Sequence, residues 1–264
     1  MCCHYTHGHL ALVSLKKLYK LVSEIPRYRG EDRREAVGAI VLGSIIPDIV
    51  FLRSGIEAGY PLTHWILEEQ NPIYENLNRF RPFATEFLNH SRETNGERGM
   101  HLALGYISHI ITDQFSHPLL PHDRMEYRTL CAALDAHFTD GMEEIVAHST
   151  FRKSDIDLLG YAFLLEPADR YMHLSRNTSL RLAEMQAHLG EGTIRELKDS
   201  IRDFPRFIIQ ETSKSNDALH SLSASLWNEQ TVRTYVYSNA VRSVLDRSVA
   251  ANVQFIASLL VPSP

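Results

Sequence analysis

Apolar residues recur at helical spacing along most of the chain. Leu10, Val13, Leu18 and Leu21 stand three to five residues apart, which predicts a helix over 10–22. The same pattern predicts further helices over 34–45, 71–89, 100–117, 125–150, 154–164, 166–189, 193–209, 216–227 and 230–260. No strand-like alternation of useful length interrupts them, so we expect an all-α fold.

Prolines and glycines set the expected boundaries of these helices. Pro47 and Pro118 are expected to end the second and fourth helices, and Pro82 to interrupt the third. We also expect a turn over 93–99 and a soft point at Gly141.

The histidines are distributed unevenly. Eleven of the fourteen lie within the first 150 residues. With 264 residues, we expect a single all-α domain over 1–264. Its chemistry should reside in a metal-binding part, 1–150, and the helical part 151–264 should shape the substrate pocket.

Bulk composition excludes several classes of function. A net charge of −5 without long Lys/Arg runs argues against binding of extended nucleic acid. No apolar run reaches the roughly 18 residues needed to span a membrane, and at most peripheral membrane contact is expected. Three cysteines, two of them adjacent, make no disulfide framework. The N-terminus lacks a signal-peptide pattern, so we expect a cytoplasmic protein. The sequence does not indicate an oligomeric state.

The segment from His109 to Pro118 carries the clearest chemical signal. His109, Asp113 and His117 recur every four residues within the apolar stretch 104–120. On an α-helix, i, i+4 and i+8 drift by only about 80°, so these side chains share one face. A rise of about 6 Å per step is too long for all three to hold one ion. The spacing therefore predicts a metal cluster.

Other groups are placed where such a cluster can recruit them. Asp48 follows Pro47 at a helix end, an exposed and rigid position, although it can also serve as a helix cap. His64 precedes Trp65 and has a surface role as its alternative. His137 stands three residues before Asp140, and an i, i+3 pair shares a helix face. His7 belongs to the histidine-rich start, with His4 and His9 as neighbours.

These motifs resemble the zinc-dependent phospholipase C family, which is related to the S1/P1 nucleases. The resemblance rests on Pro47-Asp48, Thr63-His64, the segment Gly105–Pro118 and a helical His137, and covers residues 1 to about 150. It implies an all-α fold around up to three zinc ions. In such proteins the first zinc would be held by Asp48, His64, His109 and Asp113. Asp113 would bridge to a zinc also held by His7, and His117 and His137 would hold the remaining zinc.

Two departures from the family's pattern affect the expected ligands. The family usually has a carboxylate four residues after the last histidine, but position 141 is Gly here. Asp140 is the nearest substitute and Glu144 the second. Secreted members also use their processed N-terminal amine and an aromatic residue, whereas this chain begins Met1-Cys2-Cys3. We therefore expect the N-terminal metal to depend on His4, His7 or His9, or to be absent.

The resulting functional prediction is a zinc-dependent phosphoesterase. Two metals close together lower the pKa of a bridging water and stabilise in-line displacement at phosphorus. Asp48 would act as metal ligand and proton acceptor, and the substrate would be a small-molecule or lipid phosphoester.

Three alternatives stay open at this point. The adjacent pair His122-Asp123 fits an HD-type phosphohydrolase, but it lies in a proline-rich loop. A non-catalytic, metal-stabilised binding protein is the second alternative. Iron or manganese at the same ligands, with a non-phosphate metabolite as substrate, is the third.

Overall fold

The computed structural model describes residues 4–22, 31–51, 73–116, 124–164, 199–210, 234 and 238–261. Within these residues the regular structure is helical throughout, so the all-α prediction is confirmed. The predicted helices over 166–189 and 216–227 lie outside the described residues. The named elements are α1 (His4–Leu21), α2 (Glu31–Ile45), the 3-10 helix η1 (Ile46–Phe51), α4 (Ile73–Ser116), α5 (Arg124–His148), α6 (Lys153–Leu164) and α12 (Asn239–Leu260).

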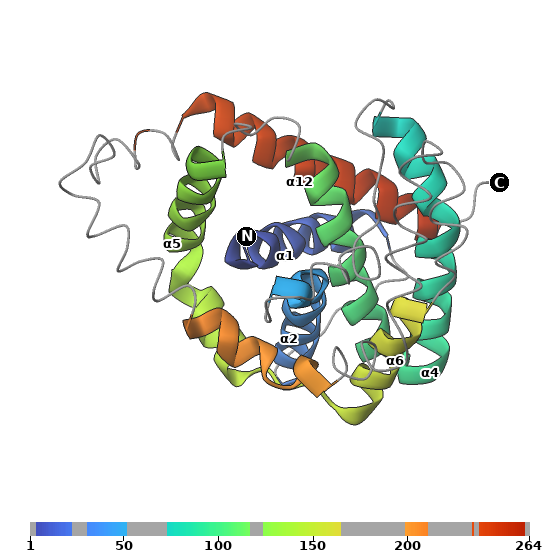
Figure 1. Ribbon diagram of the computed structural model, residues 1–264. Helices are drawn as coiled ribbons and strands as arrows, with labels where there is room; N and C mark the ends of the chain where they lie inside the picture. The colour runs from blue at the N-terminus through green and yellow to red at the C-terminus, as the bar shows by residue number, and fades with distance from the viewer. Residues whose placement is uncertain are drawn as a thin grey trace, which may run out of the picture.

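Helix α1 occupies the middle of the molecule, with α2, α4, α5 and α12 around it (Figure 1). It begins at His4, six residues before the start expected from its apolar pattern. Its first turn is therefore helical, and His4, Tyr5 and His7 are buried there. This brings the histidine-rich start of the chain into the core.

Helix α4 is a pair of arms joined at Gly96, which has a φ of 58° and a ψ of −141°. The expected interruption at Pro82 is wrong, since the helix continues through it. Pro82 deprives the carbonyl of Asn78 of its donor, but both residues are exposed, so water can replace the lost bond. The expected turn over 93–99 is also wrong, because the segment is helical except for the kink at Gly96. Phe87 of the first arm packs edge-on against Tyr106 of the second, with ring centroids 5.4 Å apart.

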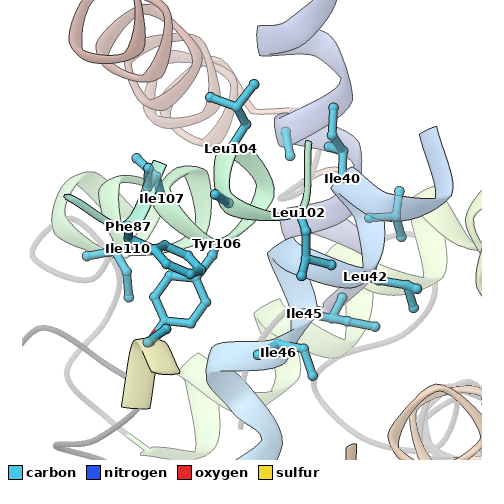
Figure 2. Packing of buried hydrophobic residues seen from close by; sticks show 14 of the residues in the cluster. Ile40, Leu42, Ile45, Ile46, Phe87, Leu102, Leu104, Tyr106, Ile107 and Ile110 are labelled. Carbon is cyan, nitrogen blue, oxygen red and sulfur yellow. The ribbon is translucent and has the colours of Figure 1, made fainter. Parts of the chain in front are cut away.

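Helix α2 crosses the second arm of α4 at very close range. A Cβ built on Gly43 would lie 2.9 Å from the carbonyl carbon of Leu102, and one on Gly105 would lie 2.9 Å from the amide nitrogen of Ser44. Glycine is therefore required on both sides of the crossing. Leu42 of α2 and Leu102 of α4 belong to the buried apolar cluster around this crossing (Figure 2).

The chain does not leave helical structure at Pro47 as expected. Instead, η1 continues directly from α2, and Pro47 is its second residue. A proline costs little there, because the first amides of a helical turn have no intrahelical acceptor. Asp48 is consequently fully buried, at 0% exposure, rather than exposed in a loop.

Helices from the second half of the chain pack against the first half. Asp155 of α6 is buried and receives a bidentate ion pair from Arg98 of α4. Asn252 of α12 donates from Nδ2 to Oγ1 of Thr112 over 3.1 Å. Thr112 immediately precedes Asp113, so α12 contacts the helix that carries the predicted metal ligands.

Candidate metal centre

Three elements bring four of the predicted ligands together. His7 comes from α1, Asp48 from η1, and His109 and Asp113 from the second arm of α4. Nε2 of His109 lies 3.2 Å from Oδ2 of Asp113 and 3.8 Å from Oδ1 of Asp48. Nε2 of His7 lies 3.2 Å from Oδ1 of Asp113. His7, Asp48 and His109 each offer a ligand atom within 4.8 Å of the other two.

The spacing of these atoms fits the first coordination sphere of zinc. Ligand atoms about 2.1 Å from a tetrahedral ion lie about 3.4 Å from one another. The contacts of 3.2, 3.2 and 3.8 Å fall around this value. The set also has the right chemistry, because imidazole nitrogens combined with carboxylate oxygens suit zinc and accept iron or manganese as well.

The orientation of His109 is set by a backbone carbonyl. Its Nδ1 lies 2.7 Å from the carbonyl oxygen of Ser44, the last residue but one of α2. A carbonyl only accepts, so Nδ1 donates and Nε2 is the atom that faces the two carboxylates. Metal-binding histidines generally use this arrangement, in which a second hydrogen bond fixes the tautomer and the ring position. The close crossing of α2 and α4 makes it possible.

The charged groups of the centre are buried, which strengthens the interactions between them. Asp48 and His109 are 0% exposed, and Asp113 only 6%. Burial lowers the pKa of His7, and the neighbouring His109 lowers it further against the pull of Asp113. Burial also opposes protonation of His109, but Asp113 and Asp48 outweigh it and its pKa is raised. Two carboxylates buried together demand a nearby positive charge, supplied either by a protonated histidine or by a cation.

The rings of the two histidines further restrict the site. His7 and His109 stack with centroids 4.0 Å apart and planes 23° apart. Stacking aligns both Nε2 atoms towards Asp113, one to each of its oxygens. Each carboxylate oxygen of Asp113 therefore faces a different imidazole.

His4 and Asp135 are the two side chains that sequence reasoning underweighted or missed. Nδ1 of His4 lies 3.1 Å from Oδ2 of Asp48, and the ring is buried. Asp135 of α5 accepts from the backbone N–H of Thr6 over 2.9 Å and from its hydroxyl over 3.0 Å. No local signal marks Asp135 in the sequence, since its partner lies 129 residues earlier.

Of the other predicted ligands, His64, His117, His137 and Asp140, the structure describes the side chain of His137 alone. His64 and His117 lie outside the described residues, as do the HD-type pair His122 and Asp123, and the Asp140 side chain is not described. His137 is exposed on α5, edge-on to Phe138, with centroids 4.8 Å apart. The ring of His9 stacks on the same Phe138 at 4.1 Å. Glu144 is exposed further along α5.

A separate cavity of about 1110 Å³ lies at the N-terminal end of α2. Its walls come from α2, α4, α5 and the connection to α6, and include Arg33, Arg34, Arg98, Gly141 and Glu144. None of the four clustered residues lines it. Asp48 follows the opposite end of α2, and Ser44, which orients His109, is the last residue but one of that helix. This cavity is therefore not the metal centre.

Comparison with known proteins identifies one family. A family model described as zinc-dependent phospholipase C matches residues 3–172, which contain all four clustered residues. No curated protein and no solved structure matches the chain significantly. Among the described residues, no helix has both the length and the apolar character needed to cross a membrane.

Proposed function

Because the chain belongs to the zinc-dependent phospholipase C family, we propose that it is a zinc-dependent phosphoesterase acting on a small-molecule or lipid phosphoester. The observation that supports this best is the convergence of His7, Asp48, His109 and Asp113 from three separate elements in one buried site. Burying two carboxylates with two histidines has a large desolvation cost unless a cation compensates it, so the donor set supports a bound metal.

Within this proposal, each residue has a defined task. His109 and Asp113 hold zinc as an i, i+4 pair on α4, with His109 fixed by the Ser44 carbonyl. Asp48 is a ligand and accepts the proton of the attacking water. Bound zinc supplies a Lewis acid that neutralises charge on the phosphate oxygens and lowers the pKa of water.

His7, together with Asp113, would hold a second ion. Two or three ions per chain are proposed, the last depending on His117, His137 and a carboxylate. His64 is proposed to complete the first position. Iron or manganese at these ligands remains part of the proposal's test, because the donor set accepts them.

We also propose that the whole chain forms one domain, in which the part after residue 151 shapes the substrate pocket. The Asn252–Thr112 hydrogen bond supports this, because it ties α12 to the residue before Asp113. The Arg98–Asp155 ion pair ties α6 to the same long helix.

The test is an Asp113→Asn variant, with Asp157→Asn as the matched control. Asp157 is an exposed aspartate of α6, outside the centre. Asp113→Asn removes one negative charge and one strong ligand, so bound metal and phosphodiester hydrolysis should both be lost while helical circular dichroism is retained. Metal is measured by elemental mass spectrometry and hydrolysis with bis(p-nitrophenyl) phosphate and short-chain phosphatidylcholine. An active, metal-replete Asp113→Asn protein would refute the proposal.

One observation favours a second candidate, a non-catalytic site that only stabilises the fold. The four residues are at most 6% exposed, and a closed site with four protein ligands is typical of structural zinc. This candidate predicts the same loss of metal in Asp113→Asn. It also predicts that the metal-loaded wild type hydrolyses none of the phosphoesters.

A further inference from the structure

We infer that His4 is a further ligand of this metal centre, next to the second oxygen of Asp48, and that Asp135 is the positioning residue that holds it there. The inference rests on one part of the proposed function, namely that a metal occupies the centre, and it does not depend on the reaction. It settles the choice among His4, His7 and His9 in favour of the first two, on the geometry of α1.

His4 and His7 form an i, i+3 pair on α1, opposite the i, i+4 pair of His109 and Asp113 on α4. Both spacings place side chains on one helix face. Asp48 of η1 lies between the two pairs, with Oδ2 3.1 Å from His4 and Oδ1 3.8 Å from His109. His4 therefore completes a ring of donors around Asp48.

The contact between His4 and Asp48 does not have the geometry of a hydrogen bond. Nδ1 of His4 is buried and has no hydrogen-bond partner in the described part of the chain, although Oδ2 lies only 3.1 Å away. A nitrogen and an oxygen this close, without hydrogen-bond geometry between them, are expected where the lone pairs of both atoms point at one metal ion. A nitrogen buried in this way is costly unless something binds it.

The position of His4 is built by other parts of the fold. Asp135 accepts two hydrogen bonds from Thr6 and one from the backbone of His4. It thereby binds the first amides of α1, which have no acceptor within the helix. On the other side, Phe204 meets the His4 ring edge-on, at 6.1 Å and 82°. The first turn of α1 cannot move without breaking these contacts.

His9 provides the contrast on the same helix. It follows His7 by two residues, which turns it about 200° away on an α-helix. Its half-buried ring stacks on Phe138 of α5 instead of facing Asp48. Among these three histidines, His4 and His7 lie on the face of α1 that meets the metal centre, and His9 does not.

The experiment compares His4→Gln with His9→Gln, the same change on the opposite face of α1. Zinc affinity is measured by competition with a chromogenic chelator, and zinc content by elemental mass spectrometry. Loss of interactions at a metal ligand or its supporting group typically weakens affinity about 10–100-fold. We expect such a loss, or one zinc fewer per chain, in His4→Gln, and an affinity within about twofold of wild type in His9→Gln.

Asp135 is tested through its effect on the metal rather than on folding alone. Asp135→Asn keeps an acceptor oxygen for Thr6, whereas Asp135→Ala removes it. We expect Asp135→Ala to weaken zinc binding and Asp135→Asn to restore most of it. In the cobalt-substituted proteins, His4→Gln and Asp135→Ala should alter the visible absorption bands, which a merely structural role would leave unchanged.

A measurement on the wild type removes any dependence on variant folding. The ring nitrogen that faces a carboxylate is Nδ1 in His4 but Nε2 in His7 and His109. In protein loaded with cadmium-113, coupling to one histidine Nδ1 should therefore accompany couplings to Nε2. Absence of any Nδ1 coupling, or an unchanged zinc affinity in His4→Gln, overturns the inference. In that event a wild type that binds metal and hydrolyses a phosphoester, with both properties lost in Asp113→Asn, still upholds the proposed function, whereas a wild type that binds no metal refutes both.

Discussion

The crossing of α2 over α4 predicts that Gly43→Ala will destabilise the protein. The new Cβ would lie 2.9 Å from the carbonyl carbon and 3.2 Å from the Cα of Leu102. Comfortable carbon–carbon contacts are about 3.5–4.0 Å, so the helices must separate by about 0.5–1 Å. The obstacle is backbone, which cannot rotate away as a side chain can.

The expected magnitude is the difference between two opposing effects. Overpacking of a well-packed interior costs about 1–3 kcal/mol, and a backbone clash belongs at the upper end. Replacing a helical glycine by alanine returns about 1 kcal/mol of helix propensity. The net loss should be about 2 kcal/mol, or about 4–8 °C in melting temperature for a chain of this size.

Gly8→Ala is the control for this prediction. Its Cβ would meet Sδ of Met142 at 3.3 Å and Cγ1 of Val41 at 3.4 Å, and both side chains can adjust. It should therefore be neutral or slightly stabilising. Both variants are compared with wild type by thermal unfolding in saturating zinc.

The same separation of helices should weaken the metal centre. Ser44 follows Gly43 and accepts the hydrogen bond that orients His109. Moving it away removes a second interaction of a metal ligand, for which losses of about 10-fold or more in affinity are usual. A Gly43→Ala protein with wild-type melting temperature and zinc affinity would refute the close packing of α2 on α4 as the device that positions His109.

Two further predictions concern α4 away from the centre. Asp155→Ala should lower the free energy of unfolding by about 3 kcal/mol or more, measured in urea, because it leaves the largely buried Arg98 guanidinium without its carboxylate; a loss below 1 kcal/mol would contradict this. Burial lowers the pKa of His101 below 6.5, so the unfolded chain binds more protons and His101 costs stability as the pH falls through 6.5. His101→Gln should therefore lose less stability than wild type between pH 7 and pH 5.

Helix α4 shows how far local sequence reasoning reaches. The apolar stretch with His109 and Asp113 predicts a helix with both ligands on one face, and the structure confirms the helix. This succeeds because helical periodicity is a property of neighbouring residues. The predicted interruptions at Pro82 and over 93–99 are wrong, because neither proline nor glycine breaks a helix in every setting. Solvent can satisfy a carbonyl freed by proline, and one glycine at positive φ can replace a whole turn.

The amino-acid sequence alone establishes the helical class, the family resemblance and the residue types from which the centre is made. Each follows from spacing along the chain. The burial of Asp48, its contact with His4 and the stacking of His9 on Phe138 follow instead from the way the helices pack. Asp135 binds the first turn of α1 although it lies 129 residues from Thr6 in the sequence. Gly43 and Gly105 let α2 approach α4 closely enough for Ser44 to contact His109. Long-range contacts of this kind leave no periodic trace, because they depend on how whole helices pack rather than on which residues are neighbours.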